Sequence, residues 1–273
     1  MSVFNTVESS IATHYFKQNQ LGYAKVLNRI SSGNRLSAVA DAGALSVSLT
    51  MNSSKSQLKS IQQNIQNSIA YLEVQDGLME TAGNIFLRVQ ELYGLYQADP
   101  LKAEDGIEKS LYNIEFNGLQ SQIEQIYESS FNGNALFVKD IGPEGEELSV
   151  RISPDGDQEI KFKRQDLDYS LGGILWDVTS LDDIDNDILA IDLEDFSTIR
   201  SENASSRKQL SIIAESLSIQ DVATTNAMDR LESIDLAYET ALLAKSSMLL
   251  QSSMSVLSQA NSNTDRVEAL LKI

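Results

Sequence analysis

Cysteine is absent from this sequence of 273 residues, and histidine occurs only once, as His14. The lack of cysteine excludes disulfide bonds, thiolate metal ligands and cysteine nucleophiles. A single histidine excludes a metal site built from several histidines of one chain, and we interpret His14 as an ordinary residue of a helix surface or interface. No glycine-rich phosphate loop or nucleophile elbow accompanies the many carboxylates. The sequence therefore predicts that the protein is not an enzyme and holds no cofactor.

Long apolar runs and clusters of positive charge are missing as well. No run approaches the roughly 18 consecutive apolar residues of a membrane-spanning helix. The first residues lack the basic start and apolar core of a secretory signal, so export would need another route. The net charge is -18, and residues 140–202 hold 18 Asp and Glu against 5 Lys and Arg. Because this stretch repels phosphate groups, we expect no nucleic acid binding, and the lack of long apolar runs predicts no membrane insertion.

Helix breakers are rare outside the middle of the chain. All 3 prolines are interior, and neither glycine nor proline occurs from Ile174 to the C-terminus, which favours long helices. A seven-residue repeat predicts one helix over residues 56–97, with Leu58, Ile65, Leu72, Met79, Phe86 and Tyr93 on one side. A second helix over residues 107–127 is predicted to fold back on it through Ile107, Leu111, Ile114, Ile123 and Ile126.

The pattern changes between residues 131 and 177. Short apolar runs at 135–138, 148–152 and 159–163 are separated by segments rich in glycine, proline and acidic residues. Such runs are typical of strands joined by tight turns. Because polar and apolar residues alternate over 159–163, we expect one face of a small sheet to pack against the helical rod.

The two ends of the chain carry apolar stripes of their own. Residues 241–261 form three consecutive heptads with apolar residues mainly at the first three places, and the N-terminal segment has a similar side from Phe4 to Ile30. We predict that the two ends pair as helices and, because so wide a stripe needs further neighbours, that other copies of the chain cover the rest on assembly. The predicted polymerisation interface is Phe4, Val7, Ile11, Leu236, Leu242, Leu243, Leu249, Leu250, Val256, Leu257, Leu270 and Leu271.

The predicted fold class is mainly α, with a long antiparallel helical rod, a terminal coiled coil and a small β-hairpin region in the middle. The expected divisions are 1–40 and 231–273 for the two halves of the terminal coiled coil, 41–130 for the first rod helices, 131–177 for the hairpin region and 178–230 for the returning rod helix. A contact between copies that does not close into a ring produces a helical filament.

One acidic cluster has the spacing of a calcium loop. Asp183, Asp185, Asp187 and Glu194 fall at positions 1, 3, 5 and 12 of such a loop, but Ile188 stands where the loop needs glycine. The neighbouring isoleucines have helical spacing instead. We therefore predict a solvated, acidic helix start and no metal site.

Three segments, in the right order along the chain, resemble bacterial flagellins. They are residues 28–47 (NRISSGNRLSAVADAGALSV), Ser130-Phe131-Asn132-Gly133 with Leu136-Phe137, and Gln259-Ala260-Asn261 followed by Val267 and Leu270-Leu271. The chain departs from the family pattern at Ala40, where an aspartate is usual, at Gly43, which sits one place early, and at Thr264, which replaces a proline. The hook-filament junction protein shares both ends, so a junction protein or minor flagellin is the alternative within this class.

The resemblance implies a self-assembling subunit of the extracellular flagellar filament, exported through the flagellar type III apparatus. It also implies an export chaperone, filament cap and hook-junction proteins as partners, and contact of Arg88 and Leu92 with the Toll-like flagellin receptor. From other classes we keep a soluble coiled-coil interaction module and, more distantly, an acidic calcium-binding secreted enzyme. Tubes of uniform width formed by the purified protein would favour the flagellin interpretation, whereas dimers that never elongate would favour the interaction module.

Overall fold

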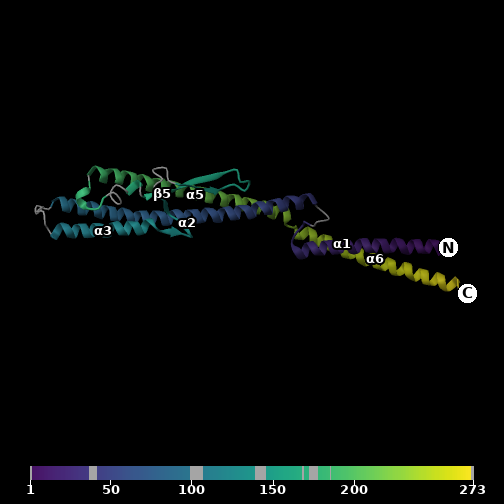
Figure 1. Ribbon diagram of the computed structural model, residues 1–273. Helices are drawn as coiled ribbons and strands as arrows, with labels where there is room; N and C mark the ends of the chain where they lie inside the picture. Colours follow the sequence, from purple (N-terminus) through teal and green to yellow (C-terminus); the bar gives the residue numbers. More distant parts are fainter. Residues whose placement is uncertain are drawn as a thin grey trace. The chain divides into compact units, whose positions relative to one another are not determined.

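The computed structural model describes residues 2–36, 42–98, 107–138, 146–167, 169–171, 178–184 and 186–271, with side chains at 2–8, 107, 108, 186, 188 and 263–271 outside the description. Its helices are α1 (Ser2–Ser32), α2 (Ala42–Ala98), α3 (Ile107–Tyr127), α5 (Asn186–Glu232) and α6 (Leu236–Leu271), with a short 3-10 helix η1 (Leu181–Asp183) before α5 (Figure 1). The predicted mainly α fold is confirmed.

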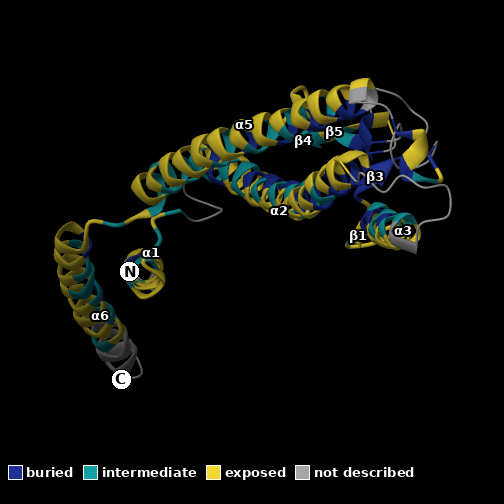
Figure 2. Cartoon of the chain, turned by 90° about the vertical axis from the view of Figure 1, so that its left-hand side faces the viewer, coloured by how far each residue is buried: buried dark blue, intermediate teal, exposed yellow. Residues whose placement is uncertain are grey.

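The chain divides into two compact units. The terminal unit consists of residues 1–53 and 223–273, and the central unit consists of residues 54–222. Buried residues concentrate in the central unit, where α2, α5 and the strands meet, whereas α1 and α6 carry mostly exposed and half-buried positions (Figure 2).

The seven-residue repeat of α2 supplies the core of the central unit. All six residues of the predicted repeat, from Leu58 to Tyr93, are buried. They pack with Phe196, Leu210 and Leu217 of α5 in one apolar cluster. The predicted helix over 56–97 is confirmed and is longer in the structure, because it begins at Ala42.

Helix α3 folds back on α2 as predicted, but with a different face. The side chain of Arg88 pairs with Glu115, and the rings of Tyr96 and Tyr112 lie 6.4 Å apart, so the two helices run antiparallel. Ile123 and Ile126 are buried as predicted.

The prediction was wrong for the first half of α3. Leu111 is 58% exposed and Ile114 is 65% exposed, while Phe116 is fully buried. At about 100° per residue, the nine residues between Ile114 and Ile123 place them on opposite sides of the helix. Tyr112 and Phe116 continue the face of Ile123 instead.

The predicted small sheet lies against the helices of the central unit. Strands β4 (Glu146–Arg151) and β5 (Glu159–Asp166) form an antiparallel hairpin, and β3 (Phe137–Val138) adds to β5 in parallel, giving the order β3-β5-β4. The face of β5 that carries buried Phe162 packs near Tyr71 of α2, with ring centres 6.0 Å apart. The alternation predicted for residues 159–163 is thus confirmed.

A second, smaller hairpin joins β1 (Ser130–Phe131) to β2 (Asn134–Ala135). Its two central residues, Asn132 and Gly133, both have positive φ, at 51° and 81°. Asparagine followed by glycine is the preferred pair for such a tight turn. The hydroxyl of Tyr71 donates to the carbonyl of Ala135 at 2.9 Å and so ties this hairpin to α2.

Candidate assembly interface

Helices α1 and α6 of the terminal unit lie side by side and run antiparallel (Figure 1). The Arg29 guanidinium pairs with the Glu239 carboxylate at 3.1 Å. Ten residues away from this pair on each helix, the Asn19 amide donates to the Leu249 carbonyl at 3.3 Å. The predicted pairing of the two chain ends is confirmed.

The pair is joined by a narrow heptad seam. The least exposed residues recur at alternating spacings of three and four, which is the repeat of a coiled coil. On α1 the seam residues are Ser9, Ala12, Phe16, Asn19, Tyr23, Val26 and Ile30, and on α6 they are Glu239, Leu243, Ser246, Leu250, Ser253, Leu257 and Ala260. One helix therefore covers only a strip of the other.

Local sequence signals fix where the two helices begin and end. The Asp235 carboxylate accepts hydrogen bonds from the backbone N–H groups of Ala237 and Tyr238, so it caps the start of α6. Gly33, directly after α1, has φ of +66°, a conformation that favours glycine and ends helices. The Asn34 side chain then accepts from the backbone of Leu36 at 2.7 Å and holds the turn.

The structure places the predicted interface residues in three groups. Leu242, Leu243, Leu250 and Leu257 are half-buried in or beside the seam, whereas Ile11, Leu236, Leu249 and Val256 are exposed. The side chains of Phe4, Val7, Leu270 and Leu271 lie outside the described residues. The predicted wide stripe is therefore covered by α1 only along its middle.

Further apolar residues flank the seam and were not in the predicted interface. They are Tyr15, Leu27, Tyr238 and Met254, and all are exposed. In the sequence these residues occupy heptad positions beside the seam, but those positions can be assigned only once the seam residues are known. We call these four residues, together with exposed Ile11, Leu236, Leu249 and Val256, the apolar flanks.

Part of the flanks borders a groove along the α1–α6 pair. The groove has a volume of about 620 Å³ and contains Ile11 and Tyr15 from α1 and Leu249 and Val256 from α6. Small residues such as Ser253 lie between the two helices there. An apolar groove of this kind accepts an apolar helix face.

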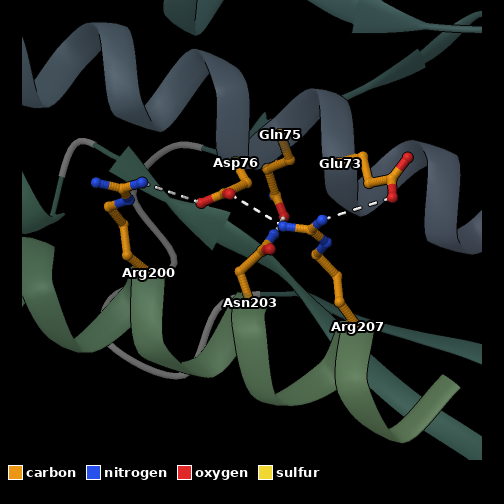
Figure 3. Close-up of polar contacts among 6 residues, drawn as sticks. All are labelled: Glu73, Gln75, Asp76, Arg200, Asn203 and Arg207. Carbon is orange, nitrogen blue, oxygen red and sulfur yellow. Dashed lines mark hydrogen bonds and ion pairs between the residues drawn. The ribbon is translucent and has the colours of Figure 1, made fainter. Parts of the chain in front are cut away.

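A polar network joins α2 and α5 in the central unit (Figure 3). The Asn203 amide donates to the Gln75 side chain at 2.6 Å, and Gln75 donates in turn to the Leu136 carbonyl at 2.7 Å. Asp76 beside them accepts from Arg207 at 3.0 Å and pairs with Arg200 at 3.3 Å. The network links two rod helices and the strand region at one point.

The two residues implied as receptor contacts have different surroundings. Arg88 is partly exposed and pairs with Glu91 and Glu115, each at 2.7 Å, and these carboxylates raise the pKa of its guanidinium. Leu92 is only 1% exposed and lies in the core of the central unit. Of the two, only Arg88 is accessible on the surface of a single subunit.

Three of the four residues of the acidic cluster lie in helices, as predicted. Asp183 lies in η1, Asp187 and Glu194 lie in α5, and Asp185 is outside the described residues. A continuous helix separates the last two, so they do not share a calcium loop. Within the described ranges, no group of three or more carboxylates or histidines could hold a metal ion.

His14 is exposed on α1, where its ring contacts Tyr15 edge-on at 6.0 Å. This position agrees with the interpretation of an ordinary surface residue. Among the described residues, none of the helices combines the length and the apolar character that a bilayer span requires.

Long paired helices, a small sheet against a rod and apolar flanks on the paired chain ends define a helical structural subunit. The sequence matches the bacterial flagellin N-terminal helical region over residues 3–140 and the bacterial flagellin C-terminal helical region over residues 187–271. The chain therefore belongs to the bacterial flagellin family and is a structural subunit of the flagellar filament.

Relatives match over their full length. A flagellin of Listeria monocytogenes is 23% identical over 290 residues, with 99% of each chain covered. The flagellar filament 33 kDa core protein of Treponema phagedenis is 23% identical over 296 residues, and the flagellin of Bacillus subtilis is 24% identical over 306 residues, with 100% of both chains covered in each case.

Proposed function

We propose that the apolar flanks of α1 and α6 are the surface through which copies of this chain polymerise. The observation that carries the proposal is the narrow seam, which leaves large apolar side chains such as Leu249 and Val256 exposed on helices already paired with each other. Exposed apolar surface of this extent is typical of protein contacts. Sister copies supply matching helix faces.

The energetics favour assembly. Burial of apolar surface contributes about 25 cal/mol per Å², so a contact of a few hundred Å² contributes several kcal/mol. Repeated around each copy, such contacts offset the entropy lost when the chain ends become ordered. A contact that joins unlike surfaces and does not close gives a helical polymer.

We further propose that the terminal unit is the terminal coiled coil of the filament and that the central unit is its rod, with the finer divisions predicted from the sequence. Export through the flagellar type III apparatus to an extracellular filament fits a chain with no cysteine. A chaperone that covers the C-terminal stripe, the filament cap and the hook-junction proteins are proposed as partners, and Arg88 as a contact for the Toll-like receptor. The role is structural and not enzymatic.

Removal of residues 241–273 tests the assembly proposal. The truncated chain should form no tubes after seeding or salting-out, as seen by negative-stain electron microscopy, because α6 then lacks most of its flank residues. Its central unit should stay folded, since Ser54–Val222 keeps its own core, and protection from limited proteolysis provides the control. Tubes formed by the truncated chain would contradict the proposal.

A further inference from the structure

The seam residues of α1 and α6 repeat so regularly that apolar packing alone does not fix the register of the two helices. The contacts of Asn19 and Arg29 across the pair set one antiparallel register. In that register the seam residues fall into layers that pair Ser9 with Ala260, Ala12 with Leu257, Phe16 with Ser253, Asn19 with Leu250, Tyr23 with Ser246, Val26 with Leu243 and Ile30 with Glu239. Large residues of one helix mostly meet small residues or leucine of the other.

Sliding α6 by one heptad changes these layers very little. Leucine recurs at 243, 250 and 257, and a small residue recurs at 246, 253 and 260. After a slip in one direction Tyr23 meets Ser253 in place of Ser246. Val26 likewise meets Leu250 in place of Leu243. Because equivalent residues return every seven positions, such a slip keeps the apolar contacts of a coiled coil.

The layer next to Arg29 is the exception. Glu239 is 4% exposed, so its carboxylate depends on the Arg29 guanidinium for compensation. A slip in one direction leaves Ser246 opposite Ile30, and a slip in the other moves Glu239 beside Tyr23. Either slip separates Glu239 from Arg29, and in the second Glu239 stays in the seam as a buried charge without its partner, which is strongly unfavourable.

The same end of the pair carries a second set of polar contacts. The Glu232 carboxylate accepts hydrogen bonds from Ser48 and, at 3.4 Å, from the Asn34 side chain. The Glu232 carbonyl accepts from the backbone N–H of Arg35 at 2.8 Å. A heptad slip would break these contacts as well. We call the side chains of Arg29, Asn34, Ser48, Glu232 and Glu239 the end clamp.

We propose that the end clamp selects the register of the α1–α6 pair, a choice that the repeating seam does not make. Arg29 and Glu239 act as positioning residues inside the seam, and Glu232 reinforces them beyond its end. The inference rests on the proposed assembly in one respect: a regular filament needs every copy to present its flanks in the same register.

Disulfide trapping reads the register directly, because the chain has no cysteine of its own. Asn19→Cys combined with Leu250→Cys reports the register of the structure. Asn19→Cys combined with Leu257→Cys, or with Leu243→Cys, reports a slip of one heptad in either direction. Each reporter pair is oxidised under assembly conditions, and internal cross-links are recognised by their migration as compact monomers on non-reducing gels.

With the end clamp intact, only the 19–250 pair should cross-link inside one chain. In the variant Arg29→Leu/Glu239→Leu/Glu232→Ala the 19–250 yield should fall several-fold and one slipped pair should appear. The charge-exchanged variant Arg29→Glu/Glu239→Arg keeps a pair at the same layer and should restore the 19–250 cross-link. Far-UV circular dichroism checks that the helices remain formed in each variant.

The proposal is overturned if the variant without the clamp still cross-links only through 19–250, or if the intact chain fails to cross-link there. If the variant without the clamp forms none of the three cross-links and the charge-exchanged variant forms the 19–250 cross-link, a positioning role is still supported. A chain that keeps the 19–250 register yet forms no tubes would count against the proposed assembly and leave the register inference standing.

Discussion

At the scale of single residues, the buried amides of Gln75 and Asn203 show how much one polar contact contributes to the rod. Replacing Asn203 with alanine leaves the Gln75 oxygen buried without the donor that it has at 2.6 Å. The loss should lower the free energy of unfolding by about 1–3 kcal/mol. Urea unfolding followed by circular dichroism measures it.

Asn84→Ala is the matched control, because this asparagine is exposed on α2. Its effect should stay within about 0.5 kcal/mol. Equal effects of the two substitutions would show that the buried contact has no special importance.

Two glycines of α2 make a second comparison. A Cβ at Gly77 would meet nothing within 4 Å, whereas one at Gly83 would lie 3.0 Å from the ring of Phe196 on α5. Alanine is favoured over glycine inside a helix by about 1 kcal/mol. Gly77→Ala should therefore stabilise the chain against urea, and Gly83→Ala should gain less or destabilise, since the buried Phe196 ring must move. A larger gain at Gly83 would contradict the packing described.

At the scale of elements, the start of α6 depends on one side chain. Asp235→Ala removes the cap on Ala237 and Tyr238 and should cost about 1 kcal/mol of helix stability. If α6 becomes ordered only on assembly, this cost should raise the critical concentration for tube growth about five-fold. Sedimentation of polymer measures that concentration. Asp235→Asn, which keeps an acceptor oxygen, should stay close to the native value.

The long helices and the strands of the hairpin could be predicted because their signals are local. The heptad of α2 and the alternation in β5 each repeat within one segment. The face of α3 could not be assigned in the same way, since Leu111 and Ile114 are as apolar as Ile123 and only the partner helix decides which side is covered. The parallel addition of β3 to β5 depends on a contact distant in sequence and left no local signal.

The candidate interface was predictable to a similar degree. The sequence indicated apolar stripes at both chain ends, but it did not separate seam residues such as Leu250 from flank residues such as Val256. That separation depends on register. The register in turn depends on Arg29, Glu232 and Glu239, three charged residues that no apolar pattern brings together.

At the scale of the whole molecule, the apolar flanks connect the fold to the filament. They are exposed on a single chain and are proposed to become covered among copies. The chain contains no cysteine, so Val256→Cys introduces a single thiol at a flank position that is 59% exposed. Its rate of labelling by a water-soluble maleimide reports whether that position is open to solvent.

The most direct test compares this rate in unassembled chains and in tubes of the same variant. We predict rapid labelling in unassembled chains, strong protection in tubes, and a return to rapid labelling when the tubes are depolymerised by mild heating. Equal labelling before and after assembly would show that the flank at Val256 stays open in the filament, and would contradict the account.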